Sequence, residues 1–372
     1  MTRAHGLDGL RGAAALAVVL VHAWMYGGAN LPGADRTTVD AVIGELRVSL
    51  MLFFVLSGFL VVLPWIRAGL DDRAAPSLRR FASKRAARIL PAYWLALVGS
   101  YVLLHGTGHR REAELGDLPV FALFGQNYFD ETRTLLNPPM WSLAVEVAFY
   151  ALLPVIGWVL VRAIARGGRP AALAVAGGLA AFGLAWSSAA LRLDWPATMT
   201  ATLPTYLPIF ACGIAAAALA HGRTPSWQTR WSLLLGGAAL VGWNGWWHHD
   251  GTTDVGKVLL DLPAGIGFGM IVAAVAAHGP ALLARGPLRW VGIVSYGFYL
   301  WHMPVIYVLR LQERWPENPW LAYLSVVAVA LTLAVISWFG VERWVAGEGR
   351  SKKRTAPQRT GERRPAPSRA TA

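Results

Sequence analysis

Long apolar stretches, separated by short polar segments, recur along almost the whole chain. A helix that crosses about 30 Å of hydrocarbon needs roughly 20 mostly apolar residues. The pattern therefore predicts an all-α fold, a polytopic membrane bundle of about ten transmembrane helices. The ten predicted spans run approximately over Leu10–Tyr26, Leu46–Ile66, Ala92–Leu104, Met140–Val161, Ala171–Leu191, Ala201–Ala220, Trp231–Trp247, Val258–Ala277, Val291–Leu309 and Trp320–Phe339. A shorter apolar stretch, Leu118–Phe124, is predicted to be re-entrant or interfacial.

The distribution of charge orients these predicted spans. With the N-terminus in the cytoplasm, the inner segments are 1–11, 67–91, 162–170, 221–230, 278–290 and 340–372. They hold 25 of the 34 lysines and arginines but only 6 of the 21 acidic residues. Cytoplasmic loops carry such an excess of basic residues. Both termini are therefore predicted to be cytoplasmic, and most basic loops are interpreted as topology determinants.

Composition supports the membrane interpretation. Hydrophobic residues make up 55% of the chain and charged residues 15%, whereas soluble domains carry about 25% charged residues. The net charge of +13 follows from the basic inner loops, so no nucleic-acid partner is predicted. A single cysteine, Cys212, excludes a disulfide framework and a cysteine zinc site, and no metal is predicted. We expect one transmembrane domain over residues 1–341 and a disordered, basic, cytoplasmic tail over 342–372.

Ionisable residues inside predicted spans are candidates for function because charge is costly in hydrocarbon. Arg11 and His22 in the first span are eleven residues apart, which places them on one helix face about 16 Å apart along the axis. Histidine is suited to proton transfer near neutral pH. The alternative is structural: Arg11 extends to the interface and His22 forms a hydrogen bond between helices.

A second cluster lies at the predicted cytoplasmic end of the third span. Arg85 and Arg88 are three residues apart and precede Pro91, which suits the first turn of a helix. The planar guanidinium fork of arginine matches phosphate groups. The neighbouring basic residues Arg79 and Arg80 are interpreted as part of a positive-inside loop.

Two further spans present polar faces. Ser142 and Glu146 lie four residues apart, and Tyr150 continues the same face. The partner of Glu146 is expected to be a histidine or arginine on another span, in a catalytic or a purely structural pair. Asp261, near the outer end of the eighth span, is interpreted as a capping or hinge carboxylate.

In the ninth span, Ser295, Tyr299 and His302 share a face, and Tyr296 lies one step around the helix. His302 is predicted to lie at a depth similar to that of His22, so the two histidines are expected to share a site unless the alignment is fortuitous.

Five motifs together resemble the acyltransferase-3 family of integral-membrane acyltransferases. The resemblance covers roughly Leu7 to Trp344. The motifs are LDGLRGxAA with the Arg11-x₁₀-His22 spacing, FFVLSGFL (Phe53–Leu60), RAARILPAYW (Arg85–Trp94), WSLAVEVAFY (Trp141–Tyr150) and SYGFYLWHMP (Ser295–Pro304). One position departs from the family pattern: many members carry a second acidic residue after the equivalent of Glu146, and this chain has Val147.

The resemblance implies transfer of an acyl group, expected to be acetyl, from acyl-CoA to a hydroxyl of a carbohydrate, a cell-envelope glycan or a secondary metabolite. Acyl-CoA would be a co-substrate, with no bound cofactor, and the chain resembles the stand-alone type without an added hydrolase-like domain. We predict that Arg11, Arg85 and Arg88 bind the phosphates of acyl-CoA. The pantetheine arm, on the order of 15–20 Å long, is close to the rise of about 16 Å from Arg11 to His22.

The resemblance and this geometry assign His22 as general base, with Glu146 orienting its imidazole. Tyr299 and His302 are predicted to donate hydrogen bonds to the oxyanion or to bind the acceptor, and Tyr296 and Ser142 to bind substrate. A covalent acyl-histidine intermediate stays open.

A proton-coupled transporter or exporter of a small molecule or lipid-linked sugar is the alternative function, since it too would carry ionisable groups at mid-membrane. In either case we expect a multi-pass protein of the cell membrane, in contact with the lipid bilayer.

Overall fold

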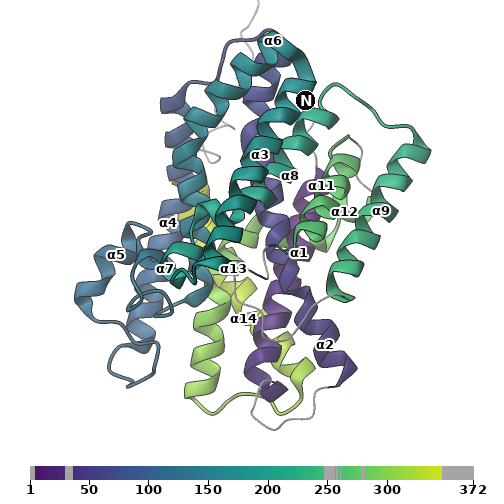
Figure 1. Ribbon diagram of the computed structural model, residues 1–372. Helices are drawn as coiled ribbons and strands as arrows, with labels where there is room; N and C mark the ends of the chain where they lie inside the picture. Colours follow the sequence, from purple (N-terminus) through teal and green to yellow (C-terminus); the bar gives the residue numbers. More distant parts are fainter. Residues whose placement is uncertain are drawn as a thin grey trace, which may run out of the picture.

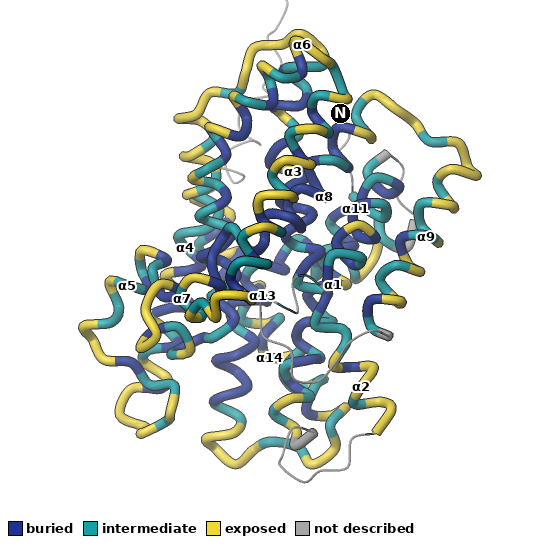
Figure 2. Tube along the Cα trace, viewed as in Figure 1, coloured by how far each residue is buried: buried dark blue, intermediate teal, exposed yellow. Residues whose placement is uncertain are grey.

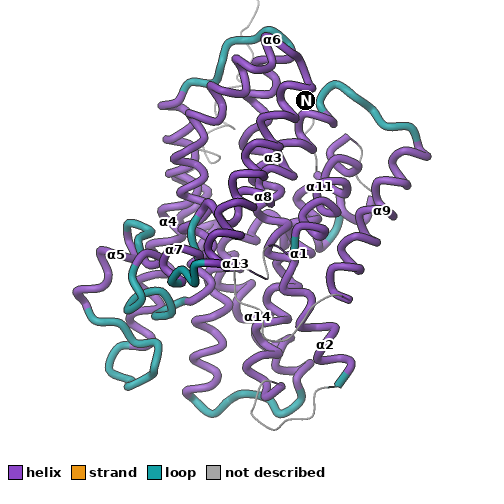
Figure 3. The backbone as a smooth tube through the Cα atoms, in the orientation of Figure 1, coloured by secondary structure: helices purple, strands orange, loops and turns teal. Residues whose placement is uncertain are grey.

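The computed structural model describes residues 5–29, 37–246, 256, 259, 261–277 and 281–345. Within these residues the fold is helical and contains no strand (Figure 3), which confirms the predicted all-α class. The longer helices stand roughly side by side, and shorter ones lie at their ends (Figure 1). Their bounds are α1 His5–Trp24, α2 Thr38–Glu45, α3 Ser49–Leu70, α4 Leu78–Leu104, α5 Leu118–Ala122, α6 Trp141–Arg192, α7 Ala197–Thr200, α8 Leu203–Ala220, α9 Trp227–Trp246, α11 Leu262–Ala277, α12 Ala281–Ala284, α13 Pro287–Leu311, α14 Pro319–Ser337 and α15 Arg343–Val345.

Seven helical segments in the described part of the chain are long and apolar enough to cross a membrane. One of them, Pro138–Arg192, contains two of the predicted spans. Gly168, with φ 59° and ψ −146°, interrupts helical geometry between these two spans, inside the predicted inner segment 162–170. Helix α9 and the 16-residue helix α11 occupy the seventh and eighth predicted spans but are not among the seven. The count of about ten and the cytoplasmic termini stay predictions.

Two apolar clusters form the interior. One joins parts of α3, α6, α8 and α11, and the other joins parts of α4, α13 and α14. Helix α1 belongs to both, because its first half packs into the first cluster and its second half into the other. Figure 2 shows α3, α8 and α13 as mostly buried, whereas the outer surface of α9 is exposed.

Glycines allow α1 and α13 to approach closely. A Cβ atom built on Gly292 would lie 1.7 Å from the carbonyl oxygen of Asp8, and one on Gly12 would lie 2.1 Å from that of Leu288. The two helices run in the same direction, since residue 8 meets 292 and His22 meets His302. This parallel contact brings the polar faces of two distant motifs to one level.

Helix α4 begins earlier than the sequence pattern predicts. The predicted span starts at Ala92, but the helix starts at Leu78, where the Ser77 hydroxyl caps it by accepting a hydrogen bond from the amide of Arg80 at 3.4 Å. Arginine and lysine favour helices, so the basic segment continues the apolar one. Pro91 consequently lies inside the helix rather than in its first turn. The apolar stretch Leu118–Phe124 forms the short helix α5 followed by a turn.

Candidate active site

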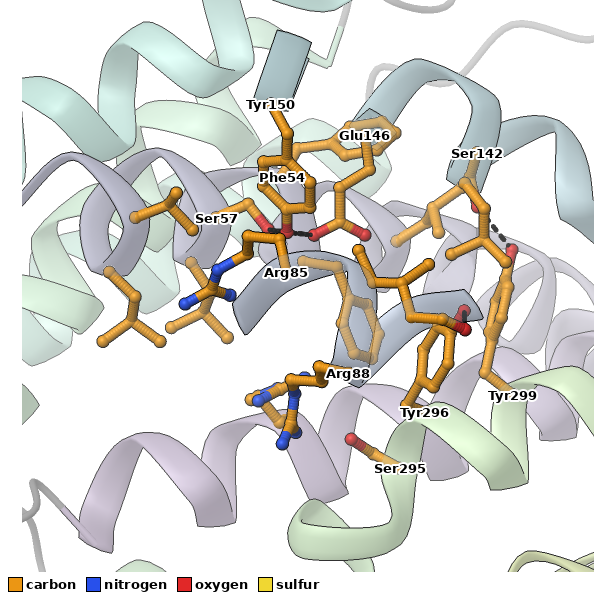
Figure 4. Close-up of a pocket in the computed structure, with 18 residues that line it drawn as sticks. Phe54, Ser57, Arg85, Arg88, Ser142, Glu146, Tyr150, Ser295, Tyr296 and Tyr299 are labelled. Carbon is orange, nitrogen blue, oxygen red and sulfur yellow. Dashed lines mark hydrogen bonds between the residues drawn. The ribbon is translucent and has the colours of Figure 1, made fainter. Parts of the chain in front are cut away.

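A cavity between α1, α3, α4, α6 and α13 collects most of the residues predicted to function. Figure 4 shows polar side chains from these helices pointing into one space. Its polar lining consists of Arg11, Ser57, Arg85, Arg88, Ser142, Glu146, Tyr150, Ser295, Tyr296 and Tyr299. The volume open to water-sized molecules is about 80 Å³. We refer to this space as the arginine cavity.

Three guanidinium groups give the arginine cavity its charge. Arg11 comes from α1, and Arg85 and Arg88 lie one turn apart on α4. Arg79, Arg80 and Lys84 of the same helix are exposed and do not line the cavity. In the described chain, no carboxylate forms an ion pair with the three cavity arginines. This arrangement leaves positive charge available to an anionic ligand.

Glu146 lies in the arginine cavity and not against His22. Its carboxylate accepts short hydrogen bonds from the Ser57 hydroxyl and from the Tyr150 hydroxyl. The Tyr150 ring in turn faces the guanidinium of Arg85, whose Cζ lies 5.8 Å from the ring centroid. Among the described residues, the hydrogen bonds of Glu146 go to Ser57 and Tyr150 and those of His22 to Val18 and His302, so the orienting role of Glu146 stays a prediction. The carboxylate is directed toward Ser57 of α3 and Tyr150 of its own helix, into the cavity that Arg11 of α1 also lines.

Hydroxyl groups of α6 and α13 bind to one another at one end of the cavity. The Tyr299 hydroxyl donates to the carbonyl oxygen of Pro139 at 2.7 Å and lies 2.8 Å from Ser142 Oγ. The Tyr296 hydroxyl donates to the carbonyl oxygen of Ile89 at 3.0 Å. Both tyrosines line the cavity, but their hydroxyl protons serve contacts within the protein. The predicted oxyanion donor role of Tyr299 would require one of these bonds to change.

His22 and His302 form a pair at mid-bundle. His302 Nε2 lies 3.3 Å from His22 Nδ1, and the ring centroids are 5.0 Å apart. His22 Nδ1 also donates to the carbonyl oxygen of Val18 at 2.9 Å, and His302 Nδ1 donates to that of Tyr299 at 2.5 Å. Because carbonyl oxygens only accept, each neutral ring carries its proton on Nδ1. The predicted proximity of the two histidines is thus present, and Nε2 of His22 is the nitrogen available as a base.

His302 is fully buried, and both of its nitrogens face groups of the protein. It does not line the arginine cavity. The geometry makes it a neighbour of His22 rather than the predicted donor to an oxyanion.

A second cavity begins at His22. We call it the imidazole cavity. It is open to water-sized molecules over about 260 Å³ and shares Leu50 and Tyr299 with the arginine cavity. Its lining comprises Val18, Val21, His22, Met25, Tyr26, Arg47, Leu50, Arg111, Pro138, Pro139, Trp141, Tyr299 and Met303. The two cavities therefore meet at Tyr299, one with the guanidinium groups and the other with the imidazole.

Several of these residues escaped the sequence analysis. Ser57 appeared in the sequence analysis only within the motif FFVLSGFL. Its neighbour Gly58 allows close packing, since a Cβ there would lie 2.2 Å from the carbonyl oxygen of Phe210. Arg47 and Arg111 fall outside the five motifs: Arg47 lies at the outer start of the second predicted span, and Arg111 lies in the predicted outer loop after the third span. Asp261 has a more specific role than a cap: it accepts from both terminal nitrogens of Arg47, at 2.7 and 2.9 Å.

No group of three or more histidine, cysteine or acidic side chains in the described part of the chain is arranged to hold a metal ion.

Residues 4–339 match the family described as an acyltransferase domain, and the chain belongs to this family. The match covers the bundle and every residue of both cavities. No solved structure matches the chain.

Three relatives show where such domains occur. The peptidoglycan O-acetyltransferase OatA of Listeria monocytogenes is 24% identical over 402 residues, which cover 92% of this chain and 56% of OatA. The exopolysaccharide production protein ExoZ of Rhizobium meliloti is 27% identical over 357 residues, covering 87% of this chain and 96% of ExoZ. YrhL of Bacillus subtilis is 27% identical over 387 residues, covering 92% of this chain and 55% of YrhL. The chain thus spans about half the length of two of these relatives.

Proposed function

We propose that this protein is an O-acyltransferase of the cell membrane, and that it transfers an acetyl group from acetyl-CoA to a hydroxyl of a cell-envelope glycan. The observation that carries the proposal is the meeting of the two cavities at Tyr299, with three arginines in one and His22 in the other. The names of OatA and ExoZ, which concern peptidoglycan and exopolysaccharide, support a glycan acceptor.

The arginine cavity is the proposed donor site. Acyl-CoA is a polyanion with a long, narrow pantetheine arm, and guanidinium groups bind phosphate through paired hydrogen bonds. Arg11 and His22 are eleven residues apart on α1, a rise of about 16 Å. Phosphates held near Arg11, Arg85 and Arg88 would therefore let the thioester reach the level of His22. The topology predicted from the excess of basic inner residues would put this end on the cytoplasmic side, where acyl-CoA is made.

The imidazole cavity is the proposed acceptor site. In the transfer step, His22 Nε2 takes the proton of the acceptor hydroxyl while the hydroxyl oxygen bonds to the thioester carbonyl carbon. The carbon–sulfur bond then breaks, and the CoA thiolate leaves with the proton returned by His22. The products are the acetyl ester and CoA, so the step balances without a further reactant. Arg47 and Arg111 line this cavity and lie on the predicted outer side, which supports an acceptor entering from outside the cell.

The transporter alternative has no specific observation in its favour. Membership in an acyltransferase family favours transfer, and the polar residues cluster around two adjacent cavities that share Leu50 and Tyr299. Of the predicted disordered tail over 342–372, residues 343–345 form the short helix α15 and residues 346–372 lie outside the described part of the chain, so the disordered cytoplasmic tail stays a prediction.

The direct test supplies acetyl-CoA labelled in its acetyl group to membrane vesicles that contain the protein and envelope glycan. We expect label on the glycan with the wild type and a loss of about 100-fold or more with His22→Ala. His105→Ala is the matched control, because His105 is exposed and pairs with Glu112 at 3.5 Å, away from both cavities. Turnover retained by a folded His22→Ala variant would defeat the assignment of the base. Label that never leaves acetyl-CoA in the wild type would defeat the proposed function.

A further inference from the structure

The imidazole cavity has a composition that bears on the kind of glycan it accepts. Three aromatic rings line it, those of Tyr26, Trp141 and Tyr299. Flat apolar rings with a polar edge match the C–H faces and hydroxyls of a sugar ring. The imidazole of His22 lies among them, so a sugar seated on these rings would have hydroxyls near the proposed base.

The charged residues that line the imidazole cavity are all basic. Two arginines, Arg47 and Arg111, line the imidazole cavity, and none of its lining residues is acidic. The guanidinium of Arg47 is held by the buried carboxylate of Asp261, at 2.7 and 2.9 Å, and Asn244 Nδ2 donates to the same carboxylate at 3.1 Å. That charge is therefore balanced within the protein.

Arg111 differs from Arg47. Its Nη1 donates to the carbonyl oxygen of Thr134 at 2.6 Å, and its own carbonyl oxygen accepts from the amide of Leu136 at 2.7 Å. These two bonds fix the loop that carries Arg111 against the segment preceding α6. Nε of Arg111 is buried and has no hydrogen-bond partner in the described chain. The guanidinium is thus positioned by neutral groups, and no described carboxylate forms an ion pair with it.

The nearest acidic residue in sequence does not balance Arg111. The carboxylate of Glu112 accepts from the amides of Gly106 at 2.5 Å and Gly108 at 3.0 Å, which close a turn. The pKa of His109 is lowered, first by burial and then by the positive charges of Arg110 and Arg111. Both observations indicate that the positive charge of Arg111, at the wall of the imidazole cavity, is not balanced by a carboxylate among the described residues.

We propose that the acceptor is an acidic glycan, whose carboxylate pairs with Arg111 while a hydroxyl of the same or the adjoining sugar reaches His22. This inference rests on the proposed function and adds to it the substrate class. A carboxylate can accept two charge-assisted hydrogen bonds from a guanidinium, and these are stronger than the hydrogen bonds that the hydroxyls of a neutral sugar can form. Arg111 then acts as a specificity-determining residue and takes no part in the transfer step.

The test compares two oligosaccharides that differ in the carboxylate alone. The acidic probe is a tetrasaccharide of alternating glucuronic acid and N-acetylglucosamine, and the neutral probe is its carboxyl-reduced counterpart. Equilibrium binding to the purified, detergent-solubilised protein is measured without acetyl-CoA. We expect the wild type to bind the acidic probe about tenfold more tightly than the neutral one. Arg111→Gln should lower affinity for the acidic probe to that for the neutral probe and leave neutral binding unchanged.

Arg110→Gln is the matched control, because Arg110 is exposed, adjacent, and absent from the cavity lining. Arg110→Gln should bind the acidic probe more tightly than the neutral probe, as the wild type does. Equal binding of the two probes by the wild type, or a preference that survives in Arg111→Gln, would overturn the inference. Because this readout needs no turnover, it is separate from the labelled-acetyl assay. Transfer to glycan without acidic preference would overturn the inference alone, and acidic preference without transfer would overturn the proposed function.

Discussion

We predict that His302 stabilises the protonated form of His22 and that its loss lowers kcat. His302→Phe removes the nitrogen that lies 3.3 Å from His22 Nδ1 and keeps a ring in the site. When His22 takes a proton on Nε2, its Nδ1–H becomes a charged donor, and hydrogen bonds to charged groups contribute about 1.5–3 kcal/mol. The bond from His22 Nδ1 to His302 Nε2 is long, at 3.3 Å, and the Val18 carbonyl oxygen accepts the same proton at 2.9 Å. We therefore use the lower end of this energy range. About 1.5 kcal/mol corresponds to roughly a tenfold loss of kcat.

The assay is steady-state transfer of labelled acetyl groups by purified protein, with kcat and KM for acetyl-CoA determined separately. KM should stay the same, because His302 does not line the arginine cavity. His302→Gln should recover most of the lost kcat, since its amide oxygen is an acceptor for His22 Nδ1. Thermal unfolding of each variant controls for disruption of the packed interior. A folded His302→Phe variant with wild-type kcat, or a folded His302→Gln variant as slow as His302→Phe, would refute the positioning role.

Three other predictions follow from the same structure. Arg88→Gln should raise KM for acetyl-CoA about tenfold with little change in kcat, whereas Arg80→Gln, at an exposed position, should alter neither. Both constants come from initial rates at varied acetyl-CoA concentration. A KM for Arg88→Gln equal to that of the wild type would show that Arg88 does not bind the donor. Gly292→Ala should destabilise the bundle by several kcal/mol, because its Cβ would lie 1.7 Å from the Asp8 carbonyl oxygen, while Gly177→Ala, with nothing within 4 Å, should be neutral or slightly stabilising in thermal unfolding. The hydrogen bond and charge of His221 lower the pKa of Asp71, so Asp71→Asn should reduce thermal stability slightly at neutral pH. The difference in stability from the wild type should vanish as the pH falls through that lowered pKa. A difference that persists in acid would contradict this linkage.

The helical class and the candidate residues were predictable because they depend on local spacing. An apolar stretch of about 20 residues specifies a helix for a bilayer wherever it occurs. The spacing of 3.6 residues per turn correctly placed Ser142, Glu146 and Tyr150 on one face, which lines the arginine cavity. It also predicted that His22 and His302 lie at one depth, because both were counted from charged helix ends.

The pairing of these faces was not predictable from spacing. Helical periodicity says which residues share a face, but the rotation of one helix against another depends on contacts between distant segments. Tertiary structure directed Glu146 to Ser57 of α3, turned His302 toward His22, and brought Arg111 from a loop to the wall of the imidazole cavity. Close approach at Gly12 and Gly292 sets the contact of α1 with α13, and with it the pairing of the two histidines. The amino-acid pattern alone thus determined a helical fold whose apolar helices carry polar faces. Packing between helices far apart in the chain decided which of those faces meet, because that choice depends on steric fit over the whole bundle.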